Sequence, residues 1–230
     1  MSESILSLSE RKAERLNSGI GDQISVRKFN LVMSLTLLWG FLINAIMVNF
    51  FSASIMTALV GVPFWGILVG YFVCAFAGIL IAAKSDNPWI SFLGYNLLVL
   101  PIGVLLCMVV PGIDGAIVTK ALLLTGITTA TMVLMGLMRP EFFLNLGRTL
   151  FVALLAGILG ELVCTFIFHY AGSLFDWLFV IIFSGYIGYD VAKAQAYPKT
   201  VDNAVDCALD IYLDIINLFI RILSILSRRD

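Results

Sequence analysis

The chain has 230 residues, of which 60% are hydrophobic and 13% charged, and its formal net charge is −1. Soluble domains are about 25% charged, so this composition and a mean hydropathy of +1.02 predict an integral membrane protein. The low net charge and the lack of a basic cluster argue against nucleic-acid binding. The four cysteines fall in apolar segments without metal-ligand spacing, which is typical of buried packing residues.

Residues 1–28 form a polar, charged N-terminal tail without the apolar core of a signal peptide. After this tail, apolar segments long enough to cross roughly 30 Å of hydrocarbon recur with short connections. We therefore expect residues 29–230 to form one all-α domain of seven membrane-spanning helices. The expected spans are 29–51, 59–83, 89–110, 117–138, 149–169, 174–190 and 203–226.

Lysine and arginine gather on the side of the expected N-terminal tail, in the tail itself and in every second loop. Because such residues favour the cytoplasmic side of a membrane, we expect a cytoplasmic N-terminus. Seven crossings place Arg228 and Arg229 outside, against this rule, and we still expect the last segment to cross. The short tails and the absence of a retention signal favour a bacterial inner membrane.

Small residues line one face of the 59–83 segment, at positions Gly66, Gly70, Cys74 and Gly78. Faces of this kind let two helix backbones approach closely in lipid, so we expect tight helix packing there.

Glu161 lies within the expected 149–169 span. A carboxylate at that depth is expected to face the protein interior. We predict an ion pair near the outer side of the membrane, with Arg221 or Lys120 as the partner.

Polar residues follow one stripe of the 203–226 segment, while the rest of its circumference is apolar. A carboxylate near the bilayer centre costs about 2.5–3.5 kcal/mol, so the stripe must meet protein, water or ions. It is either a polar seam that packs against other helices or a path for cations and protons, and we favour the path. The spacing is helical for Asn203, Asp206, Asp210, Asp214, Asn217 and Arg221.

Asp190 closes the expected 174–190 span, where a carboxylate opposes the helix dipole. If this helix extends further than predicted, Asp190 can meet Asp214. Two carboxyl groups in a poorly hydrated site titrate as a coupled pair. Such a pair can serve as a pH sensor, as a Ca²⁺ ligand set or as a catalytic dyad, and the residues alone leave these three open.

Two stretches carry a family resemblance, Tyr189-Asp190 and the segment ALDIYLDIINLF at 208–219. Together they resemble the Bax-inhibitor family, also called the transmembrane Bax inhibitor motif family. The resemblance implies that six helices surround a central C-terminal helix. It also implies a calcium-leak pathway with Asp190 and Asp214 as a pH-sensitive latch and as Ca²⁺ ligands. Lys84 is the expected latch cation, with Asp210 and Asp206 extending the acidic path.

We therefore expect a pH-sensitive calcium-leak channel that has no enzymatic activity, needs no cofactor, and meets lipid, Ca²⁺ and protons. An intramembrane aspartyl protease is disfavoured, because its Gly-x-Gly-Asp motif is replaced here by Tyr212-Leu213-Asp214 and its Pro-Ala-Leu motif is absent. The alternative is a non-conducting interaction protein that regulates a membrane protease or stress and cell-death machinery.

Overall fold

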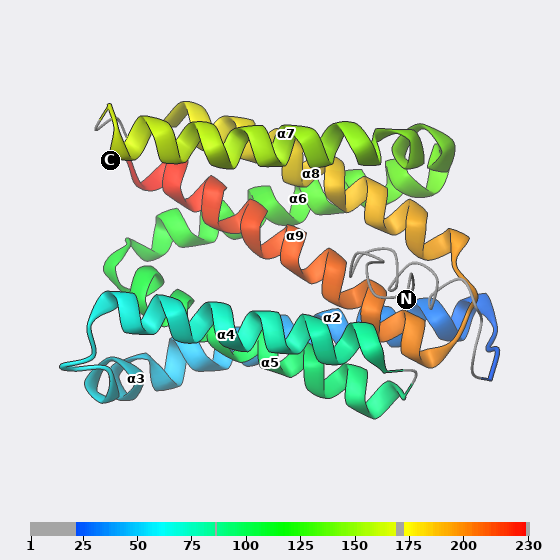
Figure 1. The fold of residues 1–230 in the computed structure, drawn as a ribbon, viewed down its shortest axis with the longest axis horizontal. Helices are drawn as coiled ribbons and strands as arrows, with labels where there is room; N and C mark the ends of the chain where they lie inside the picture. Colours follow the sequence, from blue (N-terminus) through cyan, green and yellow to red (C-terminus); the bar gives the residue numbers. More distant parts are fainter. Residues whose placement is uncertain (1–21, 86, 169–172, 229–230) are drawn as a thin grey trace, which may run out of the picture. The chain divides into compact units, whose positions relative to one another are not determined.

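The chain folds into helices joined by short connections, as Figure 1 shows. A computed structural model describes residues 22–85, 87–168 and 173–228, so most of the predicted tail 1–28 and the predicted span end at His169 lie outside the described residues. A π-helical turn (Met47–Phe51) joins the first two helices. The helices are α2 (Val26–Ile46), α3 (Ser52–Ala58), α4 (Phe64–Lys84), α5 (Pro88–Val109), α6 (Gly115–Met138), α7 (Pro140–Phe166), α8 (Ser173–Ala196) and α9 (Val201–Ser227).

Six helical segments among the described residues are long and apolar enough to cross a membrane, which confirms the predicted multi-pass membrane protein. The last helix, α9, has 27 residues and is also long enough. It is missing from these six because four aspartates and an arginine interrupt its apolar sequence, so its crossing stays a prediction. The six segments are Val26–Ala58, Trp65–Ala82, Pro88–Gly112, Gly115–Met138, Pro140–Phe166 and Ser173–Ala196.

Several helix ends differ from the prediction, among them the end of α8 and the start of α7. The helix α8 does not end at Asp190 but continues to Ala196, because alanine, lysine and glutamine after Asp190 favour a helix. It stops before Pro198, whose ring disfavours a helical conformation in the preceding residue. The helix α7 begins at Pro140, so Arg148, which we expected in a loop, lies within it. Proline suits the first helical position because its missing N–H has no partner there.

Side-chain caps begin several helices. Asp114 accepts a hydrogen bond from the backbone N–H of Ala116 at the start of α6, at 2.6 Å. At the start of α9, the Thr200 hydroxyl oxygen accepts a hydrogen bond from the backbone N–H of Asn203, at 3.1 Å. The first N–H groups of a helix lack helical partners, so these oxygens satisfy them and set the helix boundaries.

The described residues form two compact units. The first comprises the described parts of Met1–Gly112 with Tyr197–Leu209, and the second those of Ile113–Ala196 with Asp210–Asp230. The boundary falls within α9.

Each unit contains one very close approach of two helix backbones at a pair of glycines. A Cβ atom on Gly78 of α4 would lie 2.6 Å from the carbonyl oxygen of Gly94 of α5, and one on Gly136 of α6 would lie 2.6 Å from that of Gly188 of α8. Of the predicted small-residue face on α4, Gly78 makes such an approach, whereas a Cβ atom on Gly70 would meet nothing within 4 Å.

The helix α9 is buried on nearly all sides. The predicted polar stripe is in the interior, with Asp206 fully buried and Asp210 half-buried. The apolar sides are buried too, including Ile211 and Leu218. The structure describes α9 from end to end, and Ile220 is its one exposed side chain.

The connection between α8 and α9 packs against the start of α2, within the first unit. The backbone N–H of Ile24 donates to the carbonyl oxygen of Lys199 at 2.7 Å. The ammonium of Lys199 lies 4.7 Å from the ring centroid of Phe29 and donates to the carbonyl oxygen of Tyr197. Burial lowers the pKa of Lys199 because the charged form loses water.

Candidate functional site

Two carboxyl groups meet in the second unit. Asp190 of α8 and Asp214 of α9 are hydrogen-bonded to each other through their side chains. Their exposed fractions are 9% and 7%. They can meet because α8 runs past Asp190 to Ala196, which places this carboxyl group within the helix and not at its end. The structure thus brings together the two residues that the sequence analysis paired.

Lys193 is the cation at this pair. Its Nζ lies 3.7 Å from Oδ1 of Asp190, one turn earlier on α8, and 3.7 Å from Oδ2 of Asp210 on α9. The contact with Asp210 therefore joins the two helices one turn away from Asp214. The sequence analysis missed Lys193 because it ended the helix at Asp190. If the predicted helix had continued to Ala196, it would have placed Asp190 and Lys193 one turn apart.

Tyrosine rings border this acidic group. Tyr186 is close enough to interact electrostatically with Asp190, Asp214 and Lys193. The Lys193 ammonium lies 5.6 Å from the ring centroid of Tyr189, within range of a cation–π interaction. Aromatic rings thus lie next to the charged groups of this site.

The remaining predicted acidic residue, Asp206, is fully buried two turns before Asp214 on α9 and belongs to the first unit. One turn further back, Asp202 accepts a hydrogen bond from the Ser91 hydroxyl at 2.6 Å. Asp202 extends the four-residue spacing, and we missed it because we began the helix at Asn203. The side chain of Lys84, the predicted latch cation, lies outside the described part of the structure.

A second charged group joins α7, α8 and α9 in the second unit. The Arg221 guanidinium binds Glu161 through both nitrogens, at 2.7 and 2.9 Å, and Asp176 at 3.0 Å. Of the two partners that the sequence analysis offered for Glu161, the structure shows Arg221 and not Lys120 in contact with it. Asp176 was missed, although an acidic residue in the first turn of an apolar helix was a visible signal.

Asp176 is 2% exposed and holds several partners at once. Its second oxygen accepts a hydrogen bond from the Ser224 hydroxyl at 2.9 Å and lies 3.5 Å from the guanidinium of Arg228. The Arg221 guanidinium also lies 4.2 Å from the ring centroid of Phe179. This cluster contains two carboxylates and two guanidinium groups, so its formal charges cancel.

No group of three or more His, Cys, Asp or Glu side chains within the described residues is placed to hold a metal ion. Ca²⁺ takes six to eight oxygen ligands. Asp190 and Asp214 offer at most four carboxylate oxygens between them, fewer than Ca²⁺ takes.

Comparison with known proteins gives one family and two relatives. The model of the family described as inhibitor of apoptosis-promoting Bax1 matches residues 25–230. Uncharacterized proteins from two strains of Helicobacter pylori are 29% and 30% identical to this chain over 162 residues. Each alignment covers 67% of this chain and 68% of the relative. The family match includes both charged groups described above.

Proposed function

This chain belongs to the Bax-inhibitor family, whose model matches it from residue 25 to residue 230, and from that premise we propose that it conducts Ca²⁺ across a membrane under the control of pH. The observation that carries the proposal is the buried hydrogen bond between Asp190 and Asp214, with Lys193 beside it. In this role the carboxyl groups bind protons and cations, and they catalyse no reaction.

The hydrogen bond itself supports proton binding at this site. An ionised carboxylate can only accept hydrogen bonds, so a direct bond between two carboxyl groups requires one proton. In the proposed mechanism, Asp190 and Asp214 share a single proton in this arrangement. Groups that interact this closely titrate as a pair, not as two independent residues.

A second proton would neutralise the pair and weaken its attraction to Lys193. The ties between α8 and α9 at this point are the carboxyl pair and the contact of Lys193 with Asp210. A difference of one pKa unit between two states of a protein is worth about 1.4 kcal/mol. A modest difference in proton affinity can therefore shift the equilibrium between two packing arrangements of α8 and α9. We infer that acidification releases α8 from α9 and raises the flux.

The cation would follow the acidic side of α9. Asp206, Asp210 and Asp214 recur every four residues, about 6 Å apart along the helix axis. Carboxylate oxygens suit Ca²⁺, which retains water where the protein offers too few ligands. In this proposal Ca²⁺ is the transported ion, and no resident cofactor is involved.

The proposed pathway requires that α9 crosses the membrane and lies at the centre of the six other spans. This arrangement is the one that the family resemblance implies. The distribution of Lys and Arg in the sequence supports a cytoplasmic N-terminus, and we propose a bacterial inner membrane as the host membrane.

Calcium flux into liposomes tests the proposal. Purified protein is reconstituted around an internal Ca²⁺ dye, and the initial rate is measured across pH against protein-free liposomes of the same lipid. We expect flux above this background that increases as pH falls. A rate equal to background at every pH would reject conduction and favour a non-conducting partner, such as a regulator of a membrane protease.

A further inference from the structure

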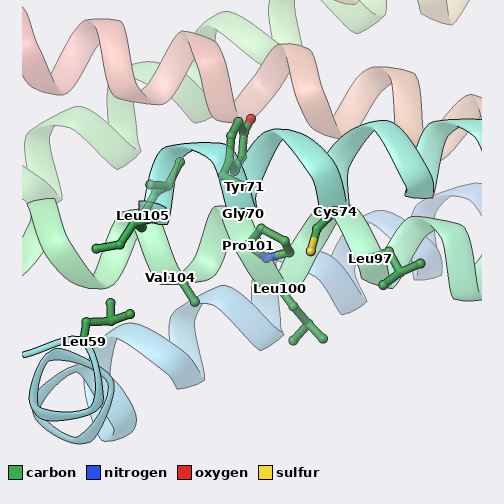
Figure 2. A pocket seen from close by; sticks show the side chains of 10 residues that line it. Leu59, Gly70, Tyr71, Cys74, Leu97, Leu100, Pro101, Val104 and Leu105 are labelled. Atoms are coloured by element: carbon green, nitrogen blue, oxygen red, sulfur yellow. The ribbon is translucent and has the colours of Figure 1, made fainter. Parts of the chain in front are cut away.

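The first unit contains an apolar cavity between α4 and α5, shown in Figure 2. Its volume is about 360 Å³. The lining consists almost wholly of apolar side chains. Gly70 and Cys74 of α4 line one side, and Leu97, Pro101 and Val104 of α5 line the other.

The cavity follows from how these two helices pack. Gly78 and Gly94 bring the backbones together, and a Cβ atom on either would lie 2.6 Å from the carbonyl oxygen of the other. Gly70 lies about 12 Å further along α4, where a Cβ atom would meet nothing within 4 Å. Pro101 interrupts α5 at this level, and a proline inside a helix removes a hydrogen bond and bends the axis.

Part of the cavity lining is itself exposed. Leu100 on α5 is 47% exposed, and Gly70 on α4 is exposed as well. Both helices belong to segments long and apolar enough to span a membrane. A surface of this kind on a spanning helix faces hydrocarbon, so the cavity opens towards lipid tails and not towards water.

We propose that this cavity binds an acyl chain of a membrane phospholipid. Its lining is almost wholly apolar and it opens on a surface of membrane-spanning helices, so the hydrocarbon of the bilayer is the medium that reaches it. Water is excluded as a filling because so apolar a space offers few hydrogen-bond partners. A flexible hydrocarbon chain recovers the dispersion contacts that the lining side chains lack when the space is empty.

Photo-crosslinking in a bilayer tests the inference. The protein is reconstituted in phosphatidylglycerol and phosphatidylethanolamine vesicles that contain a trace of phospholipid with a diazirine midway along one acyl chain. After irradiation, labelled peptides are quantified by mass spectrometry. We expect the peptide with Leu97 and Val104 to be labelled more heavily than the α7 peptide with Phe151 and Leu159. These two α7 side chains are more than half exposed and report ordinary contact with lipid.

Gly70→Leu should fill the cavity without a clash and reduce labelling of the α5 peptide several-fold. Gly126→Leu is the matched control, since Gly126 of α6 also has no atom within 4 Å of a Cβ position. It should leave the labelling unchanged. Cys74→Leu is a second filling variant, in case Gly70→Leu does not fold. Native mass spectrometry should show one phospholipid fewer retained by the filled variants.

Labelling of the α5 peptide that does not exceed the α7 peptide would overturn the proposal. So would equal labelling of wild type and a folded filling variant. Neither result depends on Ca²⁺ flux, so this inference stands or falls separately from the proposed conduction.

Discussion

Arg221 of α9 binds both carboxylate oxygens of Glu161 of α7, at 2.7 and 2.9 Å. Such two-pronged contacts use the planar guanidinium group and are stronger than bonds between neutral groups. The same Arg221 nitrogen that contacts Glu161 at 2.7 Å lies 3.0 Å from Asp176 of α8. One side chain thus joins three helices.

Removing this link should destabilise the protein. We expect Arg221→Gln to cost about 1–3 kcal/mol, because it leaves Glu161 and Asp176 without their shared cation. Glu161→Gln should cost less, since Arg221 keeps Asp176. The double variant should recover part of the summed loss, as measured by unfolding in one detergent. Strictly additive losses would show that the two side chains do not interact energetically.

Neutralising either member of the carboxyl pair should remove most of the pH dependence of Ca²⁺ flux. Asp190→Asn and Asp214→Asn keep nearly the same volume but cannot share the titrating proton. Glu161→Gln and Asp206→Asn are the controls, since both remove a carboxyl group outside the pair. They should keep the wild-type profile. A wild-type profile in both pair variants would place the pH sensor elsewhere.

Lys193→Gln should move the flux profile to higher pH by about one unit. Its ammonium lies 3.7 Å from a carboxylate oxygen of both Asp190 and Asp210, and this positive charge opposes protonation. Without it, the second proton binds at a lower proton concentration. Lys120→Gln on α6 is the charge-matched control, because Lys120 is exposed and outside the acidic group. An unchanged midpoint in Lys193→Gln would exclude Lys193 from the switch.

A methyl group on Gly94 should destabilise the first unit. It would lie 2.6 Å from the carbonyl oxygen of Gly78 and 3.0 Å from the backbone nitrogen of Ala82, so the two helices must separate. We expect Gly94→Ala to cost about 1–3 kcal/mol. Gly70→Ala has open space and should be neutral or stabilising by up to about 1 kcal/mol. Thermal unfolding of both variants in the same detergent measures the difference, and equal stabilities would contradict the close contact.

Composition and the length of the apolar segments were enough to predict the membrane class and the helical fold, and helical periodicity was enough to predict the stripe on α9. The length of the apolar run located α5 to within one residue, because its limits coincide with polar or turn residues. The ends of α7 and α8 were harder to predict, since both helices continue into polar sequence. Capping and proline positions decide those ends, and hydropathy does not register them.

Partners across helices were predicted only in part. The charges of Glu161 and Arg221 made a pair a natural expectation, yet Asp176 and Lys193 emerged only from the packing. Similarly, Gly66, Gly70 and Gly78 are equivalent in sequence spacing, and only the facing helix determines which of them touches a backbone. The local sequence pattern identifies which face of a helix is polar or small. Which other helix packs against that face depends on the whole fold.

The two charged groups differ in how they would respond to voltage. Glu161 and Asp176 balance Arg221 and Arg228, so displacing this group as a whole moves no net charge through the electric field. The three carboxylates of Asp190, Asp210 and Asp214 and the ammonium of Lys193 carry, with the one shared proton that we propose, a net charge of about −1. A potential of 100 mV across the membrane is worth about 2.3 kcal/mol for one charge that crosses it fully. Membrane potential should therefore bias movement of the acidic group and leave the neutral one in place.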